Sequence, residues 1–393
     1  MEKGSKRMAS FVKAPLLMVA GVKGAVGSTV AAAVAALHKD PAVVQPWLTT
    51  GQWFNHKNVL SEIQFAGWDP SPHPLVRSVK NHGVLPAGQV SSYDECLAGF
   101  EIRRPPDQGR PLRIQIEQLI GDIQDFKKRF PENHPVLVNL LPACEAVNFE
   151  NCSDFDQLCR EIGDVGFPDP AYVFAAIAAG APVINFTSNM VEIPLTIHEA
   201  VKAGVPICGR DGKTGQTYLK VVIASALKMR SLQVDGWFSL NILGNDDGKN
   251  LANPGKAAGK LANKTELLDE ILGYQAGQKY GSACHKVIID YYPPRGDCKE
   301  AWDVIDFTGI FGMPMSLRLN LQARDSILAA PMVIDLSLWM AALQHAGRSG
   351  PVPELGFYFK KPVGPGASAT FQGQLADLRR LERFLSEKIV AAS

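Results

Sequence analysis

The amino-acid sequence predicts an α/β protein: a doubly wound parallel sheet, followed by a second, α+β domain that begins near residue 236. Through the first half of the chain, short β-rich runs alternate with helical stretches, and this alternation is typical of a parallel sheet covered by helices. From residue 236 the sequence turns polar and loop-rich and then contains longer strand-like runs. The length of 393 residues also favours two domains, because single cores stop growing at roughly 250 to 300 residues.

The expected elements follow in order along the chain. The first domain is predicted to contain strands at residues 15–21, 42–50, 135–143, 182–188 and 205–210, and helices at 29–40, 174–180 and 197–204. In the second domain, residues 285–294 and 316–323 are predicted to form antiparallel strands. Apolar residues then recur at helical spacing in 329–347 and 375–392, so the tail of the chain is expected to pack back on the first domain.

The composition is that of a soluble globular protein. Hydrophobic residues make up 46% and charged residues 20% of the chain, and a formal net charge of +1 provides no field that would attract nucleic acid or an anionic membrane. The apolar run near the amino terminus passes directly into Gly21, and the run at 172–186 is interrupted by Gly180 and Pro182, so neither an export signal nor a membrane helix is predicted. We therefore expect a cytoplasmic protein with no nucleic-acid and no membrane partner.

The cysteines and histidines predict no metal site. The seven cysteines form no C-x-x-C pair and have no histidine at zinc-ligand spacing, so we interpret them as reduced, mostly structural thiols. The pair His198-Glu199 lacks the second histidine of a metalloprotease helix.

A glycine-rich loop, GVKGAVGST at residues 21–29, links the first strand to the first helix. Glycine lets the backbone approach a pyrophosphate there, and the helix amino terminus faces it with free N–H groups, so the loop predicts a dinucleotide site. The alternative is a tight strand-to-helix turn without a ligand. The usual second glycine is replaced by Lys23, and the acidic residue expected about 20 positions further on is absent, because that region reads QPWLTTG. The candidate cofactor residues are Gly21, Val22, Lys23, Gly24, Ala25 and Val26.

The stretch GRDGKTGQT, residues 209–217, contains the letters GKT of a nucleotide-triphosphate loop. Such a loop needs a glycine five residues before its GK pair, and that position is Ile207, so the spacing does not fit an ATP site. An apolar, helix-like run follows, and hydroxyls, an amide and backbone N–H groups at its start favour a phosphate monoester. The alternative is a capped surface helix, because threonine is a common N-cap residue. The candidate phosphate ligands are Thr214, Gly215, Gln216 and Thr217.

Further loops downstream combine lysines with carboxylates and amides. They read NILGNDDGKN (241–250), GKLANK (259–264), RGDCK (295–299), RDS (324–326) and FKKP (359–362). Any one of them could be a solvated surface loop. Two of the lysines, Lys260 and Lys264, would share one face if GKLANKTELLDE begins a helix.

Taken in order, these motifs resemble the myo-inositol-1-phosphate synthase family across most of the chain. As an ordered set at compatible spacing they are highly specific. The matches are the glycine loop ending in GST, Gly67-Trp68-Asp69, INFTSN (184–189), D-x-K-[ST]-G-Q-T (211–217), LGN-x-DG-x-NL (243–251), Lys260 with Lys264, Gly296-Asp297 with Lys299, Asp325-Ser326 before LAAP, and Lys360 before Pro362.

The resemblance implies an isomerase, an intramolecular lyase, that uses bound NAD to convert glucose 6-phosphate into 1L-myo-inositol 1-phosphate. In that family carbon 5 is oxidised, the ketone enolises, carbon 6 attacks carbon 1 in an intramolecular aldol step, and the ketone is reduced again. The enolate and the alkoxide are oxyanions that need nearby cations or acids, and four lysines would supply them.

The resemblance also implies roles for individual residues. Lys260 and Lys299 would act at the carbon 5 oxygen, and Lys360 would act at the carbon 1 oxygen. Lys264 would bind the phosphate or an adjacent hydroxyl. The phosphate would be held by residues 214–217. The remaining candidates are Asp211 beside the lysines, Asn241 at the substrate, Asp69 on the adenosine side, and Asn245, Asp246, Asp247, Gly296, Asp297, Asp325 and Ser326 around the cofactor.

The architecture of the family is a further expectation. A Rossmann-type, NAD-binding domain would be built from residues 1–235 and 331–393, and the inserted α+β segment 236–330 would supply catalytic lysines and tetramer contacts. We expect a homotetramer in which a sheet crosses subunits. A monovalent or divalent cation near the phosphate is a further possibility within the family, although the sequence shows no ligand cluster for it.

Several positions depart from the family pattern. An aspartate is usual where Arg210 stands, Ala25-Val26 replace a polar pair, and MVEIP (190–194) differs from the common segment on the phosphate side. A guanidinium in place of a carboxylate changes local charge and could reorganise hydroxyl recognition. Three alternatives therefore stay open: a related synthase that cyclises another sugar phosphate, such as fructose 6-phosphate, to a five-membered cyclitol phosphate; an NAD-dependent sugar-phosphate dehydrogenase; and a non-catalytic NAD-binding protein.

Overall fold

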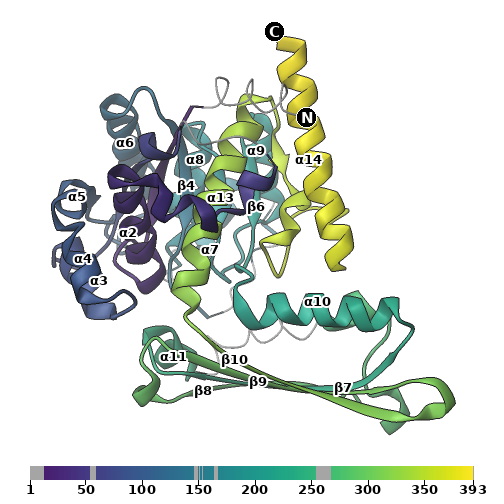
Figure 1. Ribbon diagram of the computed structural model, residues 1–393. Helices are drawn as coiled ribbons and strands as arrows, with labels where there is room; N and C mark the ends of the chain where they lie inside the picture. Colours follow the sequence, from purple (N-terminus) through teal and green to yellow (C-terminus); the bar gives the residue numbers. More distant parts are fainter. Residues whose placement is uncertain are drawn as a thin grey trace.

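The computed structural model describes residues 13–53, 59–145, 149, 151–152, 154–162, 167–253 and 267–392. It contains a seven-stranded parallel sheet between layers of helices and, beneath it in the view of Figure 1, a four-stranded sheet. The predicted α/β class, with a doubly wound parallel sheet, is confirmed.

The parallel sheet has the strand order β11-β6-β5-β4-β1-β2-β3. The chain order reverses between β1 and β4, and the crevice outside the carboxyl ends of the strands at such a point is the usual ligand site of open α/β sheets. The strands are β1 (Pro15–Ala20), β2 (Gln64–Trp68), β3 (Glu101–Arg103), β4 (His134–Asn139), β5 (Val183–Asn185), β6 (Pro206–Gly209) and β11 (Gly350–Pro351).

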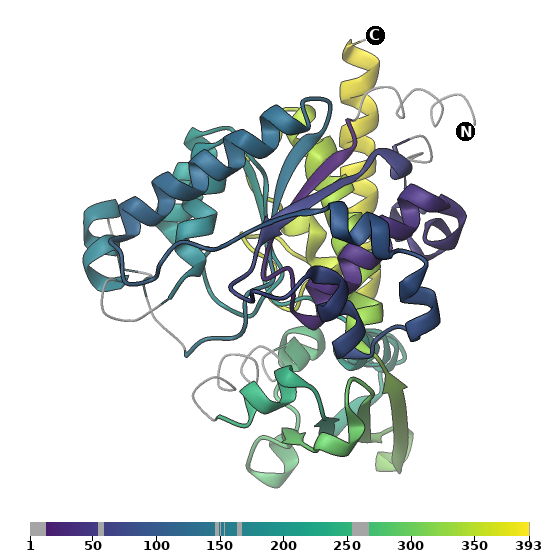
Figure 2. The ribbon, with the colours of Figure 1, turned by 90° about the vertical axis from the view of Figure 1, so that its left-hand side faces the viewer.

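Two hydrophobic cores flank this sheet, and alternate residues of β1 enter them. On one face, Leu17 and Val19 pack with α2 (Ala25–Lys39) and α13 (Asp325–His345). On the other face, which carries α6 to the left of the sheet in Figure 2, Leu16 and Met18 pack with α6 (Leu112–Arg129) and α8 (Asp169–Ala178). Leucines of α14 (Phe371–Ala392) join the first core, so the prediction that the tail packs back on this part is confirmed.

Shorter helices complete the layers. The α-helices are α3 (Leu75–His82), α4 (Ala87–Ser91), α5 (Asp94–Gly99), α7 (Phe155–Ile162), α9 (Pro194–Lys202), α10 (Gly215–Met229) and α11 (Asp246–Leu251), and residues 267–272 are also helical. Among the described residues, α13 is the one helix long and apolar enough to cross a membrane, but 78% of its apolar window is buried inside the structure, as in a core helix.

The four-stranded sheet has the order β10-β9-β7-β8, and α10 lies across one of its faces (Figure 1). Its strands are β7 (Gln233–Leu243), β8 (His285–Tyr291), β9 (Lys299–Thr308) and β10 (Pro314–Ala323). β9 pairs antiparallel with β7 and β10, whereas β8 pairs parallel with β7, so the predicted antiparallel pairing is wrong for residues 285–291. The long connection through α11 and residues 267–272 supplies the crossover that a parallel pair needs. The division of the chain into domains stays a prediction.

Residues 42–50 form no strand, and that prediction is wrong. They belong to three 3-10 helices, Pro41–Val43, Gln45–Trp47 and Thr49–Gln52, and prolines occupy the first turns of the first two. Proline has no N–H group for a strand ladder, so these residues suit short turns better than a sheet. The second strand is β2, and Asp69 follows it directly. The acidic residue at the end of the second strand is therefore present, further along the chain than expected.

Candidate active site

A cavity of about 420 Å³ opens at the carboxyl ends of the parallel strands, between them and the four-stranded sheet. The loops after β1, β4, β5 and β6 form its wall, together with the starts of α10 and α13 and the end of β7. The structure brings most of the predicted site residues to this one cavity. Those on its lining are Gly21, Gly24, Ala25, Val26, Asp211, Thr214, Gln216, Thr217, Asn245, Asp246, Asp247, Lys299, Asp325, Ser326 and Lys360.

The glycine loop has the geometry of an anion-binding turn. Its first residue, Gly21, has a φ of +88°, in the left-handed region that favours glycine. A Cβ on Gly27 would lie 2.5 Å from Gly21 O and 2.6 Å from Val22 O, so a larger residue would push α2 away from the loop. The N-cap of α2 is Gly24, and no side chain caps the helix there. The first N–H groups of α2 therefore lie uncapped beside the cavity, which fits a pyrophosphate.

The loop is supported by residues outside the lining, including three of the predicted cofactor residues. The side chain of Val22 is buried. Asp69 accepts hydrogen bonds from the backbone N–H of Lys23 at 2.8 Å and of Ser71 at 2.9 Å, and Lys23 Nζ donates to Ser71 O at 2.5 Å. Beside them His82, which sequence reasoning missed, lines the cavity and places Nε2 2.8 Å from Lys23 O. Its sequence context carries no motif that would have marked it.

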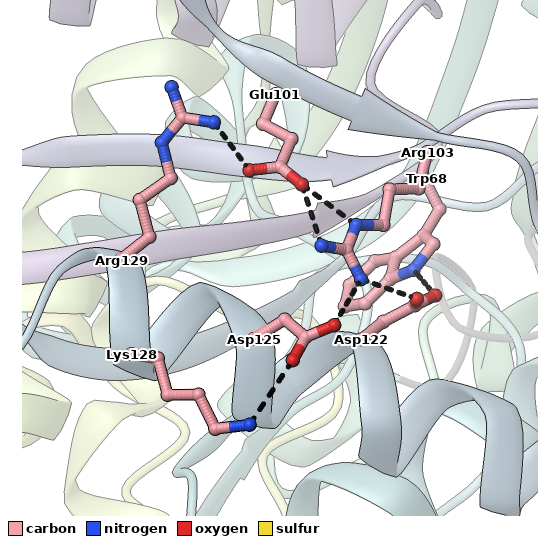
Figure 3. Close-up of polar contacts among 7 residues, drawn as sticks. All are labelled: Trp68, Glu101, Arg103, Asp122, Asp125, Lys128 and Arg129. Carbon is pink, nitrogen blue, oxygen red and sulfur yellow. Dashed lines mark hydrogen bonds and ion pairs between the residues drawn. The ribbon is translucent and has the colours of Figure 1, made fainter.

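An ion-pair network at the edge of the sheet fixes β2, the strand that Asp69 follows (Figure 3). Arg103 of β3 donates to Glu101 and, at 2.7 Å, to Asp122 of α6. The indole N–H of Trp68 donates to the second oxygen of Asp122 at 2.8 Å, and the backbone N–H of Asp69 donates to Arg103 O at 3.0 Å. The ends of β2 and β3 are thereby tied to one helix.

The start of α10 faces the cavity and not the solvent. The N-cap residue, Thr214, makes no capping hydrogen bond, because its Oγ1 donates to Asp325 Oδ1 at 2.9 Å. Next to it, Gln216 and Thr217 are buried and line the cavity, while Gly215 lies against a leucine of β10. This arrangement does not fit a capped surface helix. It leaves the amino terminus of α10 available to an anion.

Two lysine–carboxylate pairs lie on the cavity wall, and in them both lysines and Asp211 are buried, whereas Asp325 is partly exposed. Lys360 Nζ is 2.5 Å from Asp211 Oδ1, and Lys299 Nζ is 3.0 Å from Asp325 Oδ2. The backbone N–H of Lys360 also donates to Asp211 O at 2.9 Å, which joins the two loops that carry this pair. An ammonium group held in a closed site can stabilise an oxyanion and exchange a proton with it.

The lysine of the letters GKT points away from the cavity. Lys213 Nζ donates to Gly356 O at 3.0 Å and to Gln374 Oε1 at 2.7 Å, and the residue is absent from the lining. Burial, and to a smaller extent the charge of Lys360, lowers the pKa of Lys213 to about 7. This side chain ties the segment to the carboxyl-terminal helix, so it does not act as the phosphate-binding lysine of an ATP site.

The segment after β7 contributes polar side chains to the cavity. Both Asp246 and Asp247 lie on the lining with Asn245, which caps α11 through its side-chain oxygen. Asn245 Nδ2 donates to Asp297 Oδ1 at 3.2 Å, just behind the lining. Burial raises the pKa of Asp297, and this hydrogen bond acts in the opposite direction.

Besides Val22, Lys23, Asp69, Gly215 and Asp297, four more predicted residues are not placed on the cavity. Gly296 has a positive φ of 54° in the turn before β9 and lies off the lining. Asn241 is fully buried in β7, and neither polar atom of its side chain has a hydrogen-bond partner in the part of the chain that the structure describes. Both Lys260 and Lys264 fall outside the described residues. Within 13–53, 59–145, 149, 151–152, 154–162, 167–253 and 267–392, no group of three or more His, Cys, Asp or Glu side chains could hold a metal ion.

The motif INFTSN contributes residues that the sequence did not assign to the site. Thr187 and Ser188 line the cavity. Asp169 is fully buried and accepts hydrogen bonds from the side-chain amides of Asn139 at 2.7 Å and Asn189 at 3.0 Å. The oxygens of these two amides accept hydrogen bonds from backbone N–H groups of the loop 140–144, and this loop lines the cavity. Burial raises the pKa of Asp169 to about 6. The polar residues at the ends of the β-rich runs were the sequence signal that could have identified these site residues.

Two of the departures from the family pattern lie against each other. Arg210 Nη1 is 3.6 Å from Glu192 Oε2, and Glu192 belongs to the segment MVEIP. The second oxygen of Glu192 accepts from Asn185 Nδ2 at 2.7 Å. Burial raises the pKa of Glu192, and the charge of Arg210 opposes that shift. The unusual guanidinium therefore has a carboxylate partner, and neither residue is on the cavity lining.

The sequence is similar to those of known proteins. The model of the family described as myo-inositol-1-phosphate synthase matches residues 215–326. Inositol-3-phosphate synthase 1 from Bacteroides thetaiotaomicron is 33% identical over 388 residues, covering 88% of this chain and 89% of that protein. Inositol-3-phosphate synthase from Spirodela polyrhiza is 29% identical over 310 residues, covering 70% of this chain and 59% of that longer protein.

Solved structures share the fold. Inositol-3-phosphate synthase from Caenorhabditis elegans has a TM-score of 0.81 at 19% identity, over 95% of this chain and 86% of that chain. A myo-inositol-1-phosphate synthase-related protein from Thermotoga maritima has a TM-score of 0.75 at 20% identity, over 95% of this chain and 98% of that chain.

Proposed function

The chain belongs to the myo-inositol-1-phosphate synthase family and is an isomerase-type enzyme, and on this premise we propose that it cyclises glucose 6-phosphate to 1L-myo-inositol 1-phosphate with recycled NAD. The family membership predicted from the motifs is confirmed. One observation supports the activity most strongly: a single cavity collects the glycine loop, the start of α10 and two buried lysines, each paired with a carboxylate.

The cofactor proposal rests on the loop between β1 and α2. When bound, NAD would accept a hydride from carbon 5 of the sugar phosphate and later return it. The pyrophosphate would lie at the uncapped start of α2, on residues 21–26, and Asp69 would serve the adenosine side. The nicotinamide side would be formed by Asn245, Asp246, Asp247, Gly296, Asp297, Asp325 and Ser326.

The substrate phosphate would be held at the start of α10 by residues 214–217, where N–H groups and hydroxyls favour an anion. Asn241 stays assigned to the substrate by resemblance, although its side chain is fully buried in β7 and off the cavity lining. Lys264 stays assigned to the phosphate or an adjacent hydroxyl.

The lysines would move protons and stabilise oxyanions. Lys299, together with Lys260, would exchange the proton at the carbon 5 oxygen. Across the cavity Lys360 would stabilise the carbon 1 oxygen as it becomes an alkoxide. Their carboxylate partners, Asp325 and Asp211, would hold the ammonium groups in position. Positioned proton transfer of this kind contributes a factor of about 10² to 10⁴ in rate.

We also propose that the enzyme is a homotetramer. The face of the four-stranded sheet turned away from α10 exposes Phe238 (40%), Ile288 (45%) and Trp302 (51%), which lie on one side of adjacent strands. Clustered exposed apolar side chains are typical of a protein–protein contact. The cytoplasmic location and a cation near the phosphate stay predictions.

The activity is tested by incubating the NAD-loaded protein with glucose 6-phosphate and, separately, with fructose 6-phosphate. We expect NMR to show an inositol phosphate from glucose 6-phosphate, without lasting absorbance at 340 nm. A five-membered cyclitol phosphate from fructose 6-phosphate alone would identify the related synthase, and a steady rise at 340 nm would identify a dehydrogenase. Binding of NAD with no conversion of either sugar would contradict the proposal.

A further inference from the structure

Asp303 of β9 is a buried carboxylate that no step above uses, and it lies directly behind the phosphate segment. It is 2% exposed. Asp303 Oδ2 accepts from Gln216 Nε2 at 2.9 Å, and Oδ1 accepts from Trp237 Nε1 at 2.7 Å and from Ser239 Oγ at 2.5 Å. The carboxylate thus connects two residues of β7 with a residue on the cavity wall.

The groups around Asp303 fix the direction of these hydrogen bonds. An indole N–H can only donate. The hydroxyl of Ser239 accepts from Lys220 Nζ at 3.2 Å, which leaves its hydrogen for Asp303. Lys220 Nζ lies behind this group, between Ser239 Oγ and His285 Nε2 at 2.6 Å, and burial lowers its pKa to about 8, against the effect of the Asp303 charge. With donors from β7 on Oδ1, Asp303 meets Gln216 as an acceptor through Oδ2.

This acceptor determines which end of the Gln216 amide faces the substrate. An amide has a donating nitrogen and an accepting oxygen of similar size, so packing alone does not select between its two orientations. Rotation by half a turn would place Oε1 of Gln216 against the carboxylate of Asp303, which is repulsive. In the observed orientation one N–H is used by Asp303, and the second N–H and the carbonyl oxygen remain for the cavity.

We propose that Asp303 is a positioning residue for substrate recognition: it orients Gln216 so that the second N–H can donate to a phosphate oxygen while the carbonyl oxygen accepts from a hydroxyl of the sugar. The proposal rests on the function proposed above, because it deepens the role of the phosphate segment. Since Asp303 acts through Gln216, the two residues behave as one unit in substrate binding.

The test uses Asp303→Asn in the NAD-loaded protein. Asparagine keeps one oxygen as the acceptor for Trp237 and Ser239 and then turns its NH2 toward Gln216, so it favours the opposite orientation of the Gln216 amide. We expect the dissociation constant of glucose 6-phosphate, measured by calorimetry, and its KM to rise about tenfold or more. The affinity for NAD should stay unchanged, and kcat should change less than KM. Combining Asp303→Asn with Gln216→Ala should weaken binding no further than Gln216→Ala alone.

Asp235→Asn is the matched control. Asp235 is 3% exposed in β7 of the same sheet, and its partners Thr308 and Lys279 lie away from the cavity lining, so this variant should bind glucose 6-phosphate like the wild type. Independent, additive losses in the double variant, or wild-type binding by Asp303→Asn, would overturn the proposal.

Two further outcomes are also decisive. If circular dichroism shows that Asp303→Asn does not fold, Ser239→Ala, which removes one donor to Asp303, should raise the same dissociation constant several-fold, and an unchanged constant would overturn the proposal. A wild-type protein that binds glucose 6-phosphate without cyclising it would contradict the proposed activity, and the binding comparison would still decide the role of Asp303.

Discussion

At the scale of single residues, the proposed chemistry depends on lysines that are held out of water beside carboxylates. Burial alone disfavours an ammonium group, and a carboxylate at hydrogen-bond distance restores its charge and fixes its direction. The pairs Lys360–Asp211 and Lys299–Asp325 have this arrangement on the cavity wall. Removing either lysine would leave a carboxylate at the cavity without that cation.

Lys299→Ala or Lys360→Ala is expected to abolish detectable turnover, because each removes a proton donor or oxyanion partner worth about 10² to 10⁴ in rate. Bound NAD and the oligomer should be retained, since the glycine loop and the outer sheet face lie elsewhere. The measurement is kcat together with NAD content and native mass. Lys361→Ala is the control, because Lys361 pairs with Glu270 at 3.5 Å and is not on the lining. Near-normal activity in either test variant would show that the lysine assignment is wrong.

Asp169 should make folding stability depend on pH. Burial raises its pKa from the ordinary 3.8 to about 6, so the folded chain holds this proton more tightly than the unfolded chain. The stabilisation is fully present below about pH 4 and is lost as the pH rises through 6. Relative to Asp169→Asn, the wild type should lose about 2 kcal/mol of unfolding free energy between pH 4 and pH 7. Urea unfolding of both proteins at several pH values measures this, and a pH-independent difference would contradict it.

Sequence motifs identified most of the residues on the cavity but not their partners. The spacing around GKT excluded an ATP loop. The structure agrees, because Lys213 donates to Gln374 and does not face the cavity. The pairing of Gln216 with Asp303 joins two different elements, α10 and β9, and only tertiary packing determines such a contact. The same holds for Arg210 and Glu192, which look like unrelated departures in the sequence and form one ion pair in the fold.

At the scale of elements, the turn between β1 and α2 is a closely packed piece of backbone in the site. Two glycines of this turn differ in what they tolerate. A Cβ on Gly27 would meet backbone oxygens at 2.5 Å and 2.6 Å, whereas the nearest atom to a Cβ on Gly24 is Gly21 O at 3.5 Å, an ordinary contact.

Gly27→Ala is therefore expected to destabilise the fold by about 1 to 3 kcal/mol, as overpacking does, and to weaken NAD binding as well. Gly24→Ala should leave the melting temperature close to that of the wild type and act on NAD affinity alone, because its methyl group would occupy only the approach to the helix start. Thermal unfolding with and without NAD compares the two. Equal melting temperatures for both variants would argue against the close approach at Gly27.

The elements predicted correctly are those with a strong local pattern. The glycine turn and the apolar runs of β1, β4, β5 and β6 have such patterns and were found, because buried parallel strands are nearly continuous in apolar residues. The β-branched and aromatic residues of 42–50 suggested a strand, but Pro41 and Pro46 in the first turns favour 3-10 helices. The parallel pairing of β8 depends on a long crossover, and no local pattern specifies the direction of a pair.

At the scale of the whole molecule, the cavity exists because the carboxyl ends of one sheet face a second sheet. Neither sheet alone encloses it: the glycine loop comes from the first, and Lys299 begins β9 of the second. The sequence indicated the second sheet through a change in composition and strand length near residue 236, but only the fold shows the contact between the two sheets. The outer face of the second sheet remains exposed in a single chain and is the surface on which the tetramer proposal rests.

Trp302→Asp is expected to shift the protein from tetramer to smaller species, because it places a charge in the middle of the exposed apolar face. Light scattering after size exclusion gives the mass. The control is Trp47→Asp, since Trp47 is 73% exposed in the 3-10 helix Gln45–Trp47, outside this sheet, and should leave the mass unchanged. A monomeric wild type would contradict the proposed assembly.

The most direct test of the central claim, that one cavity holds a recycled NAD beside a sugar phosphate, is a crystal structure of the protein with NAD and glucitol 6-phosphate, an open-chain analogue of the substrate. We predict the pyrophosphate at residues 21–26, the analogue phosphate at residues 214–217, and the ammonium groups of Lys299 and Lys360 within hydrogen-bond distance of the sugar oxygens. A sugar phosphate bound away from the nicotinamide, or lysines directed away from it, would contradict the account.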